Sequence, residues 1–336
     1  MKALIWGAGA IGGTMGAYLA RAGHDITLVD VVSEHVDAIN EQGLTIEGSI
    51  DTFTVNIPAC TPDALTGAFE TVILAVKAHH TEAATKQLEP HLTADGCIVS
   101  AQNGLNETII ADIVGEARTV GCFVNFGADY LEPGRIHYGG RGAVVVGELD
   151  GQPSARVQAL HQACLDFDDA AILTANIWGY LWSKLAYGAM LFATALTNAS
   201  IADALAEPTY HDLFIALPKE VLQVALARDI APEPFNGFDP TAFLPDSSRE
   251  QAEQSLQAMV AFNRKSAKTH SGVWRDLAVR KRKTEIDVQL GLVLPLAQAV
   301  NVPTPLLSRL IELIHTVEDG EEQGWQHLDD LQARLP

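Results

Sequence analysis

Residues 2–23 combine a short apolar strand, a glycine turn and a helix, and no other feature constrains the fold as strongly. The strand KALIW leads directly into GAGAIG, and the helical pattern GTMGAYLARAG follows. In a dinucleotide-binding fold the first glycine permits a tight turn, the second lets a pyrophosphate approach, and the third allows close helix–strand packing. A turn of purely structural use is the alternative. The predicted phosphate-binding residues are Gly7, Gly9, Ala10, Ile11 and Gly12.

The second predicted strand, DITLVD, ends in an acidic residue that bears on the choice of cofactor. Asp30 follows the glycines by about 20 residues, the spacing at which a carboxylate accepts a hydrogen bond from a ribose 2′-hydroxyl and repels a 2′-phosphate. The next residues, 31–33, are Val, Val and Ser and supply no cation. The sequence therefore favours NAD over NADP, with a solvated turn carboxylate as the alternative.

Further strands alternate with helical stretches as far as residue 118, which predicts a parallel sheet covered on both faces. TFTVNIPAC, TVILAVKA and GCIVSAQNG are the strands, and HHTEAATKQLEPHL is a helical stretch. Ligands bind beyond the carboxyl ends of such strands, where Lys77 and Asn103 fall. Each is a cofactor-site candidate or a turn residue. His79 and His80 read as a surface pair at a helix start, and we predict no metal site.

The sequence pattern changes after residue 118. Residues 119–148 predict antiparallel strands that finish the sheet. From about Leu160 onward the patterns are helical, so we expect a dinucleotide-binding domain over residues 1–167 and an all-α domain for substrate binding and dimerisation over 168–336. The predicted helical segments are Tyr210–Arg228, Ser247–Lys268, Trp274–Val300 and Pro305–Val317.

Bulk composition excludes several classes. A formal charge of −20 argues against a nucleic-acid or anionic-membrane partner, which selects a basic surface. The four cysteines are scattered, without CxxC pairs, as expected of reduced thiols in a cytoplasmic protein. No apolar run reaches the roughly 18 residues of a membrane span. We expect a soluble cytoplasmic protein.

Two charged positions in the helical half stand out. Lys184 is the single charge in WSKLAYGAMLFATAL, so it either extends its ammonium out of a core helix or is held inside for chemistry. Glu285 enters an apolar helix in KTEIDVQLG.

Residues 264–283 hold eight of the 22 lysines and arginines, and they form either an anion-attracting patch or a solvated face. These eight are Arg264, Lys265, Lys268, Arg275, Arg280, Lys281, Arg282 and Lys283.

A series of short motifs runs along nearly the whole chain: GAGAIGG, LAVKAHH, QNGL, PGRIHYGGRGAVVVGE, WSKL, KTEID and VPTP. In their order and approximate spacing these motifs resemble those of the ketopantoate reductase family. The resemblance implies a Rossmann-type α/β domain followed by an all-α domain like that of 6-phosphogluconate dehydrogenase. It also implies reduction of 2-oxo acids to (R)-2-hydroxy acids by a dinucleotide.

The resemblance assigns roles to individual residues. Lys184 corresponds to the catalytic lysine and Glu285 to the substrate-binding acid, while Asn103 resembles the asparagine near nicotinamide and Lys77 the cofactor-site lysine. Chemistry agrees, because hydride addition to a ketone leaves negative charge on oxygen, which a cation stabilises and protonates.

Departures from the family concern the substrate and the cofactor. Ketopantoate reductases carry asparagines one and two turns after the lysine, where this chain has Gly188 and Phe192, or Leu191 with a gap of one residue. A serine before TEID is replaced near Val273, with Ser271 close by in the sequence. The pocket is predicted to be less polar, and the family is mostly NADPH-dependent. The substrate-binding candidates are Asn103, Gly188, Phe192 and Ser271.

The sequence thus predicts an NAD-dependent oxidoreductase, resembling D-mandelate-type dehydrogenases, that interconverts a 2-oxo acid and an (R)-2-hydroxy acid. Lys184 is its general acid/base, the substrate is a small carboxylate, and a homodimer is expected. The alternatives are a true 2-dehydropantoate 2-reductase and a catalytically silent NAD-binding regulatory protein. Retention of both Lys184 and Glu285 argues against the silent protein.

Overall fold

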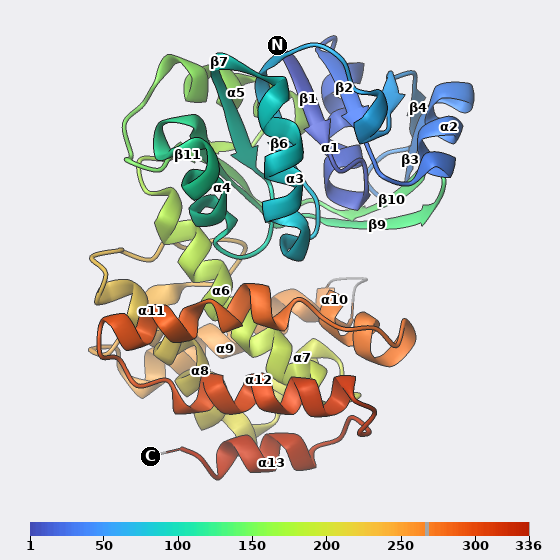
Figure 1. Ribbon diagram of the computed structural model, residues 1–336. Helices are drawn as coiled ribbons and strands as arrows, with labels where there is room; N and C mark the ends of the chain where they lie inside the picture. The colour runs from blue at the N-terminus through green and yellow to red at the C-terminus, as the bar shows by residue number, and fades with distance from the viewer. Residues whose placement is uncertain (266–268, 336) are drawn as a thin grey trace. The chain divides into compact units, whose positions relative to one another are not determined.

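The computed structural model describes residues 1–265 and 269–335 and divides into two compact units, Met1–Ile177 and Trp178–Pro336. The first unit is α/β and the second is helical, which confirms the predicted fold class (Figure 1). The division falls later than the expected boundary after residue 167. The reason is that strand β12 (Ile172–Leu173) pairs with β11 (Val144–Glu148) and so belongs to the sheet of the first unit.

An eight-stranded sheet forms the centre of the first unit, in the order β12-β11-β8-β7-β6-β1-β2-β5. Its neighbours pair in parallel except β8 and β11, which are antiparallel. Parallel strands end at the same edge, so the loops after β1, β2, β6 and β7 are neighbours there. The other strands are β1 (Lys2–Trp6), β2 (Asp25–Val29), β5 (Ala59–Cys60), β6 (Phe69–Leu74), β7 (Leu92–Ser100) and β8 (Thr119–Val124).

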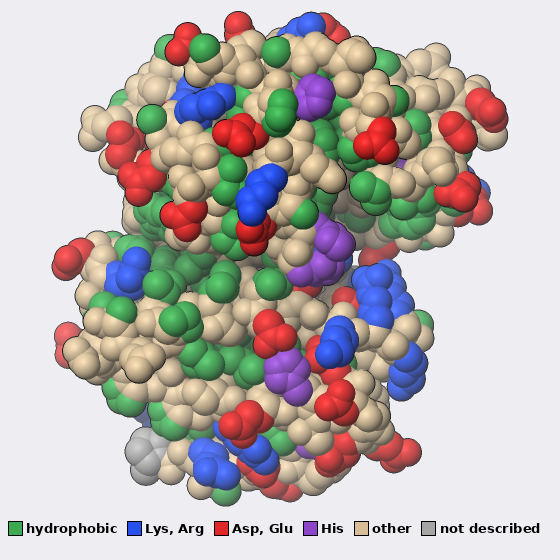
Figure 2. Space-filling view, viewed as in Figure 1, with side chains coloured by type: hydrophobic (Ala, Val, Ile, Leu, Met, Phe, Trp, Pro, Cys, Tyr) green, Lys and Arg blue, Asp and Glu red, His purple; other side chains and the backbone are tan. Residues whose placement is uncertain are grey.

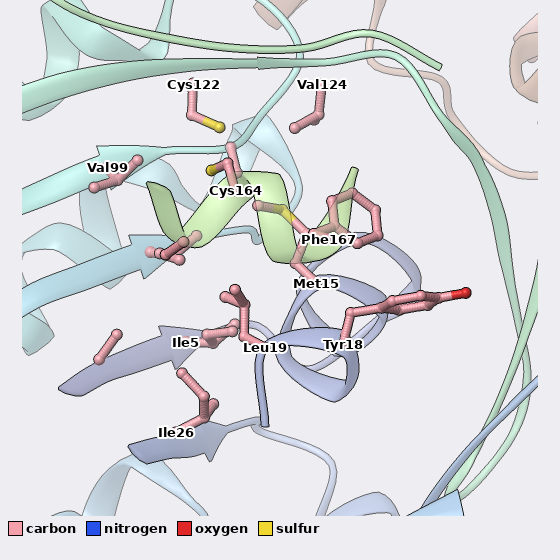
Figure 3. Close-up of a cluster of buried hydrophobic side chains, with 14 of the residues drawn as sticks. Ile5, Met15, Tyr18, Leu19, Ile26, Val99, Cys122, Val124, Cys164 and Phe167 are labelled. Carbon is pink, nitrogen blue, oxygen red and sulfur yellow. The ribbon is translucent and has the colours of Figure 1, made fainter. Parts of the chain in front are cut away.

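Alternate side chains of β1 enter two separate apolar cores, which is why the strand is apolar throughout. Ile5 packs in the core beneath α1 (Ala10–Arg21) and α5 (Ala155–Phe167), which also holds Met15 and Phe167 (Figure 3). Leu4 enters the opposite core, beneath α3 (Thr81–Leu88) and α4 (Asn106–Val114). The glycine turn therefore follows a strand fixed on both faces.

A second sheet of four strands, in the order β4-β3-β10-β9, corrects the prediction for residues 119–148. β8 and β11 do join the main sheet, but the hairpin of β9 and β10 does not. β10 pairs instead with β3, and its Ile136 packs so closely on α1 that a Cβ on Gly13 would lie 2.4 Å from the Ile136 Cδ1 atom. The strands are β3 (Leu44–Glu47), β4 (Phe53–Val55), β9 (Gly127–Glu132) and β10 (Arg135–Gly140). Helix α2 (Ser33–Gln42) precedes β3.

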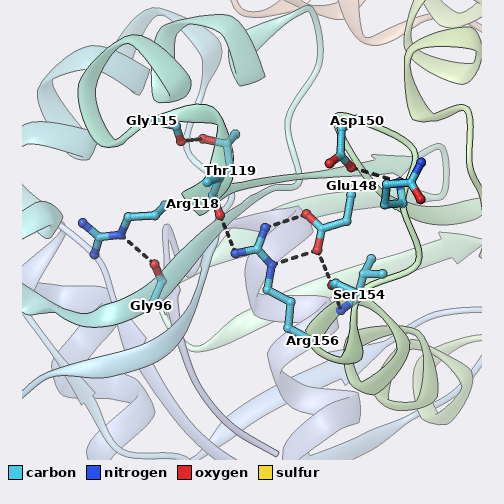
Figure 4. A network of polar contacts seen from close by, with 11 residues as sticks. Gly96, Gly115, Arg118, Thr119, Glu148, Asp150, Ser154 and Arg156 are labelled. Atoms are coloured by element: carbon cyan, nitrogen blue, oxygen red, sulfur yellow. Dashed lines mark hydrogen bonds and ion pairs between the residues drawn. The ribbon is translucent and has the colours of Figure 1, made fainter.

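A buried ion pair fixes the start of α5 on the sheet (Figure 4). Glu148, the last residue of β11, is 6% exposed and receives hydrogen bonds from Nε and Nη2 of Arg156 at 2.8 and 2.5 Å. The hydroxyl of Ser154, which caps α5, donates to the same carboxylate. A third guanidinium nitrogen donates to the Ala117 carbonyl at 2.6 Å.

The second unit is built from helices, but residues 274–300 are not the single helix that the periodicity predicts. Lys281 has a positive φ of 49°, and the buried carboxylate of Asp276 accepts hydrogen bonds from Arg280 and Arg282, so the chain turns back there. No helix of the described residues is long and apolar enough to cross a membrane. The elements are α6 (Ile177–Ala195), α7 (Ile201–Ala206), α8 (His211–Leu226), α9 (Arg249–Lys265), α10 (Gly272–Trp274), the π-helical turns η7 (Arg275–Val279) and η8 (Asp287–Gly291), α11 (Val293–Ala299), α12 (Pro305–Glu318) and α13 (Gln326–Gln332).

Candidate active site

The glycine turn after β1 has the geometry that a bound pyrophosphate requires. Gly7 has a φ of 100°, and a Cβ there would lie 2.9 Å from the Ala75 carbonyl carbon. A Cβ on Gly12 would lie 2.1 Å from the Gly7 carbonyl oxygen, so this glycine permits close packing of helix on turn. A Cβ on Gly9 would meet nothing within 4 Å, so the turn is open on that side. Tight turn, close packing and open approach fall on the predicted glycines.

Helix α1 begins at Ala10 directly after this open side. Its N-cap residue is Gly9, which has no side chain to cap the first N–H groups, and Ala10 and Ile11 are half-buried. The first N–H groups of a helix lack intrahelical acceptors and lie at the positive end of the helix dipole. The start of α1 therefore fits the phosphates of a dinucleotide.

Asp30 lies at the end of β2, where its carboxylate is joined to the glycine turn. Oδ2 accepts a hydrogen bond from the Ala8 N–H at 2.9 Å, and Oδ1 accepts one from the Val32 N–H at 3.0 Å. Each carboxylate oxygen can accept more than one hydrogen bond, so capacity remains for a ribose hydroxyl.

Lys77 and Asn103 are exposed in the loops that follow β6 and β7, at the same edge of the sheet as the glycine turn. The register confirms this neighbourhood, since Leu74 pairs with both Trp6 and Ser100 at the ends of their strands. His79 and His80 are also exposed, in a short 3-10 turn before α3.

A buried polar network that the sequence did not indicate supports these two loops. The Gln102 amide donates to the Val76 carbonyl and to the Thr81 hydroxyl, each at 2.8 Å. The Thr81 hydroxyl lies 2.8 Å from both the Ala78 carbonyl and the Asn106 side-chain oxygen, and the Asn106 amide donates to the Asn103 carbonyl at 2.6 Å. The network thus fixes the backbone on both sides of Lys77 and at Asn103.

His35 is a second residue near the glycine turn that the sequence did not indicate. Its ring is 1% exposed; Nε2 donates to the Ala8 carbonyl at 2.9 Å, and Nδ1 accepts from the Gly134 N–H at 2.9 Å. These partners fix the tautomer with the proton on Nε2. The imidazole therefore joins α2, the glycine turn and the turn between β9 and β10.

In the helical unit, Lys184 lies on the half-exposed face of α6. Tyr187, Gly188 and Leu191 follow it at the three- and four-residue spacing of one helix face and are half-exposed too. A Cβ on Gly188 would meet nothing within 4 Å, so space is open beside the lysine. Phe192 is 1% exposed, whereas the alternative Leu191 shares the lysine's face.

The loop after α8 packs on α6 beside Lys184, which the sequence also did not indicate. The Glu233 N–H lies 3.0 Å from the Ser183 hydroxyl, to which it donates. The ring centroids of Phe235 and Phe238 lie 5.9 and 5.6 Å from that of Tyr187. Burial raises the pKa of Tyr187, and a hydrogen bond with Asn263 offsets this only in part. An aromatic wall therefore adjoins the lysine's face.

Glu285 and Ser271 lie in the irregular part of the helical unit. Glu285 is half-buried and lies two residues before η8. Ser271 is 4% exposed, and its hydroxyl accepts the Trp274 N–H at 3.1 Å as the cap of α10. That cap occupies one lone pair of the hydroxyl, while Val273, at the position of the family serine, is half-buried.

The basic segment 264–283 is partly neutralised by its own fold. Arg280 and Arg282 both pair with the Asp276 carboxylate at 2.9 Å, and Lys268 lies outside the described residues. Lys and Arg side chains gather at one margin of the helical unit, around α10 and the loop after it (Figure 2). Within residues 1–265 and 269–335, no cluster of three or more His, Cys, Asp or Glu side chains is suited to a metal ion.

Comparison with known proteins covers both units. A family model described as ketopantoate reductase PanE/ApbA matches residues 3–151, and the model of its C-terminal part matches residues 176–318. The 2-dehydropantoate 2-reductase of Pyrococcus horikoshii is 29% identical over 329 residues, 95% of this chain and 98% of that protein.

Solved structures agree. A PanE/ApbA family ketopantoate reductase from Ralstonia eutropha JMP134 aligns with a TM-score of 0.78 and 25% identity over 95% of this chain and 99% of that one. D-mandelate dehydrogenase, solved with NADH and anilino(oxo)acetate, aligns with a TM-score of 0.80 and 23% identity over the same shares of the two chains.

These matches confirm an enzyme of the oxidoreductase class that acts on CH–OH groups. The two family models together span the glycine turn, Lys77 and Asn103 in the first unit, and Lys184 and Glu285 in the second. The chain belongs to the ketopantoate reductase PanE/ApbA family.

Proposed function

We propose that the protein is an NAD-linked oxidoreductase that interconverts a 2-oxo acid and an (R)-2-hydroxy acid. The observation that carries this proposal is Lys184, the one charged residue of α6, on a half-exposed helix face beside the open space at Gly188. An ammonium in that setting is suited to a substrate oxygen that gains negative charge.

The reaction divides between cofactor and protein. The nicotinamide, when bound, supplies or accepts the hydride. Lys184 Nζ donates a proton to the former carbonyl oxygen during reduction and accepts the hydroxyl proton during oxidation. Glu285 accepts a hydrogen bond from the substrate hydroxyl. The glycine turn and the start of α1 hold the phosphates, while Asp30, Lys77 and Asn103 orient the rest of the cofactor.

Charges around Asp30 support NAD rather than NADP. The pKa of Tyr130 is raised, first by burial and then by three negative charges. These charges belong to Asp30, Glu34 and Glu132, so the three carboxylates lie near the same tyrosine. Glu132 is paired with Arg135, which leaves Asp30 and Glu34 as the carboxylates that oppose a 2′-phosphate. Val31, 76% exposed, offers no cation in compensation.

The surroundings of Lys184 support a substrate with an apolar side chain. Gly188 leaves space, and the neighbours on the same helix face are Tyr187 and Leu191, with Phe235 and Phe238 packed on the tyrosine. The same fold holds NADH and anilino(oxo)acetate in the D-mandelate dehydrogenase structure. A small carboxylate with an aliphatic or aromatic side chain fits these features.

The test is turnover of a panel of 2-oxo acids with NADH and with NADPH. We expect reduction of acids with apolar side chains and a preference for NADH. Lys184→Ala should reduce turnover by about 10²–10⁴-fold while NADH binding persists. Lys219→Ala, at a half-buried lysine on α8, is the matched control and should leave turnover unchanged. No turnover of any acid, or equal activity of Lys184→Ala, contradicts the proposal.

A second candidate, 2-dehydropantoate 2-reductase, is favoured by the names of the curated relatives. Efficient reduction of 2-dehydropantoate within the same panel establishes it in place of the first. A homodimer is proposed for either activity, since symmetric dimers are the commonest assemblies of soluble enzymes. Light scattering coupled to gel filtration measures the assembly directly.

A further inference from the structure

Four side chains form a continuous polar chain around the segment that carries Glu285. The Glu318 Oε1 atom accepts hydrogen bonds from the backbone N–H and the hydroxyl of Thr284, both at 2.7 Å. Its Oε2 atom lies 3.0 Å from His315 Nδ1, and His315 Nε2 lies 3.0 Å from Asp287 Oδ1. The Glu318 side chain is only 2% exposed, so its carboxylate would be costly to bury without these hydrogen bonds.

Thr284 and Asp287 stand on either side of Glu285, and helix α12 holds both. The Thr284 hydroxyl also accepts the Ile286 N–H at 3.2 Å, which begins the helical turn that leads into η8. Ile286 is 1% exposed and anchors the segment in the core. The backbone at Glu285 is therefore fixed before and after the residue by side chains of α12.

Counting protons shows which form of His315 makes both contacts. Carboxylate oxygens only accept hydrogen bonds, so each ring nitrogen that faces one must carry a proton. A neutral imidazole has a single N–H and can satisfy Glu318 or Asp287 but not both. The chain is complete only with the imidazolium.

We infer that His315 and Glu318 are positioning residues for Glu285, Glu318 acting through Thr284 and protonated His315 acting through Asp287. This inference rests on the proposed function, in which Glu285 binds the substrate hydroxyl. Neither residue is assigned a contact with substrate or cofactor.

The charges around His315 make the positioning of Glu285 depend on pH. Burial lowers the pKa of His315, but the hydrogen bond with Glu318 and the charge and hydrogen bond of Asp287 raise it by more, so the net shift is upward. Asp287 from η8 and Glu318 from α12 are the charged groups that act on the ring. A raised folded pKa means that the stabilisation is complete at low pH and is lost as the pH rises through that value.

The first test needs no turnover. Hydrogen exchange of the amides of residues 285–291, corrected for intrinsic rates, should show protection that falls as the pH rises past the His315 pKa. His315→Gln should show low protection at every pH. His315→Lys, a permanent cation, should keep protection at alkaline pH. Protection that is independent of pH in the wild type, or equal in His315→Gln, overturns the inference. Asp287→Asn, at an exposed carboxylate, tests the same contact from the other side if His315→Gln does not fold.

The second test separates substrate binding from chemistry. His315→Gln should raise KM for the 2-oxo acid about tenfold, the effect of losing one charge-assisted hydrogen bond, with a smaller change in kcat. His161→Gln, at a half-buried histidine of α5 whose Nε2 meets the Ala171 carbonyl, is the matched control. In the wild type KM should rise as the pH passes the His315 pKa, and in His315→Lys this rise should disappear.

Glu285→Gln shows whether a negative result concerns the positioning role of α12 or the role of Glu285 in the proposed function. If it raises KM and His315→Gln does not, the positioning role is wrong while the proposed function stands. If Glu285→Gln leaves turnover unchanged, the role of Glu285 in the proposed function fails, and the hydrogen-exchange result still decides whether α12 fixes the segment.

Discussion

The carboxylate of Asp30 and the backbone N–H of Ala8 lie 2.9 Å apart, so the residue expected to bind ribose also fixes the turn expected to bind phosphate. One carboxylate thus takes part in two parts of the cofactor site. Substitutions at this position must preserve an acceptor for Ala8 if they are to test the choice of cofactor alone.

Asp30→Asn keeps an amide oxygen that can accept from Ala8 and removes the negative charge, although it gives up the acceptor for the Val32 N–H. We expect the ratio of kcat/KM for NADH to that for NADPH to fall by about tenfold, since repulsion of the 2′-phosphate is removed. Asp51→Asn, at an exposed carboxylate paired with Arg21, is the control. An unchanged ratio would show that Asp30 does not select the cofactor.

Gly188→Leu should fill the open space beside Lys184. The protein should remain folded, with a melting temperature equal or higher, because leucine favours a helix over glycine by up to about 1 kcal/mol and a Cβ meets nothing within 4 Å. Steady-state kinetics should show a larger loss of kcat/KM for bulky 2-oxo acids than for 2-oxopropanoate. Equal losses would place the substrate side chain elsewhere.

Glu220 should make folding stability depend on pH. Its carboxylate is 8% exposed and accepts the N–H groups of Leu306 and Leu307 at 3.0 and 2.8 Å, at the start of α12. Burial raises its pKa, and the two backbone hydrogen bonds oppose this only in part. The unfolding free energy should therefore decline as the pH rises above about 4.3, the ordinary value for glutamate. Denaturant titrations should show a shallower decline in Glu220→Gln; the same slope in both proteins would contradict the prediction.

Arg156→Ala should destabilise the first unit without altering the site. It leaves the Glu148 carboxylate buried without its cation, which costs about 3 kcal/mol, the lower end of the usual range because Arg156 is one-third exposed. Thermal or denaturant unfolding measures the loss, while turnover per folded molecule should not change. Arg135→Ala, at an exposed ion pair, should have little effect on either quantity.

The sequence was most informative where structure depends on local order. The strand, glycine turn and helix of residues 2–21 follow from spacing alone, although Gly7 also packs on Ala75 and Gly13 on Ile136, which lie far along the chain. The motifs also located Lys184 and Gly188 on one helix face. Local patterns, however, did not show that β10 pairs with β3, since residues 135–137 and 45–47 are far apart in the chain.

The same reason applies to the supporting contacts of the site. Periodicity predicted one helix over residues 274–300, whereas Asp276, Arg280 and the positive φ of Lys281 turn the chain instead. Glu318 lies beyond the helix break and reaches Thr284 through tertiary packing. No spacing rule links such pairs, so the sequence could not indicate these supporting contacts.

The bridge from Ala8 through His35 to Gly134 gives the hairpin of β9 and β10 a use in measurement. The tip of that hairpin is exposed, with Leu131 49% accessible. Two hydrogen bonds through His35 nevertheless connect the hairpin to the glycine turn. A small environment-sensitive dye attached at position 132 would show whether these hydrogen bonds carry a change at the glycine turn as far as the hairpin. A change in its fluorescence on addition of NADH would mean that they do, and constant fluorescence would mean that the hairpin moves independently of the turn.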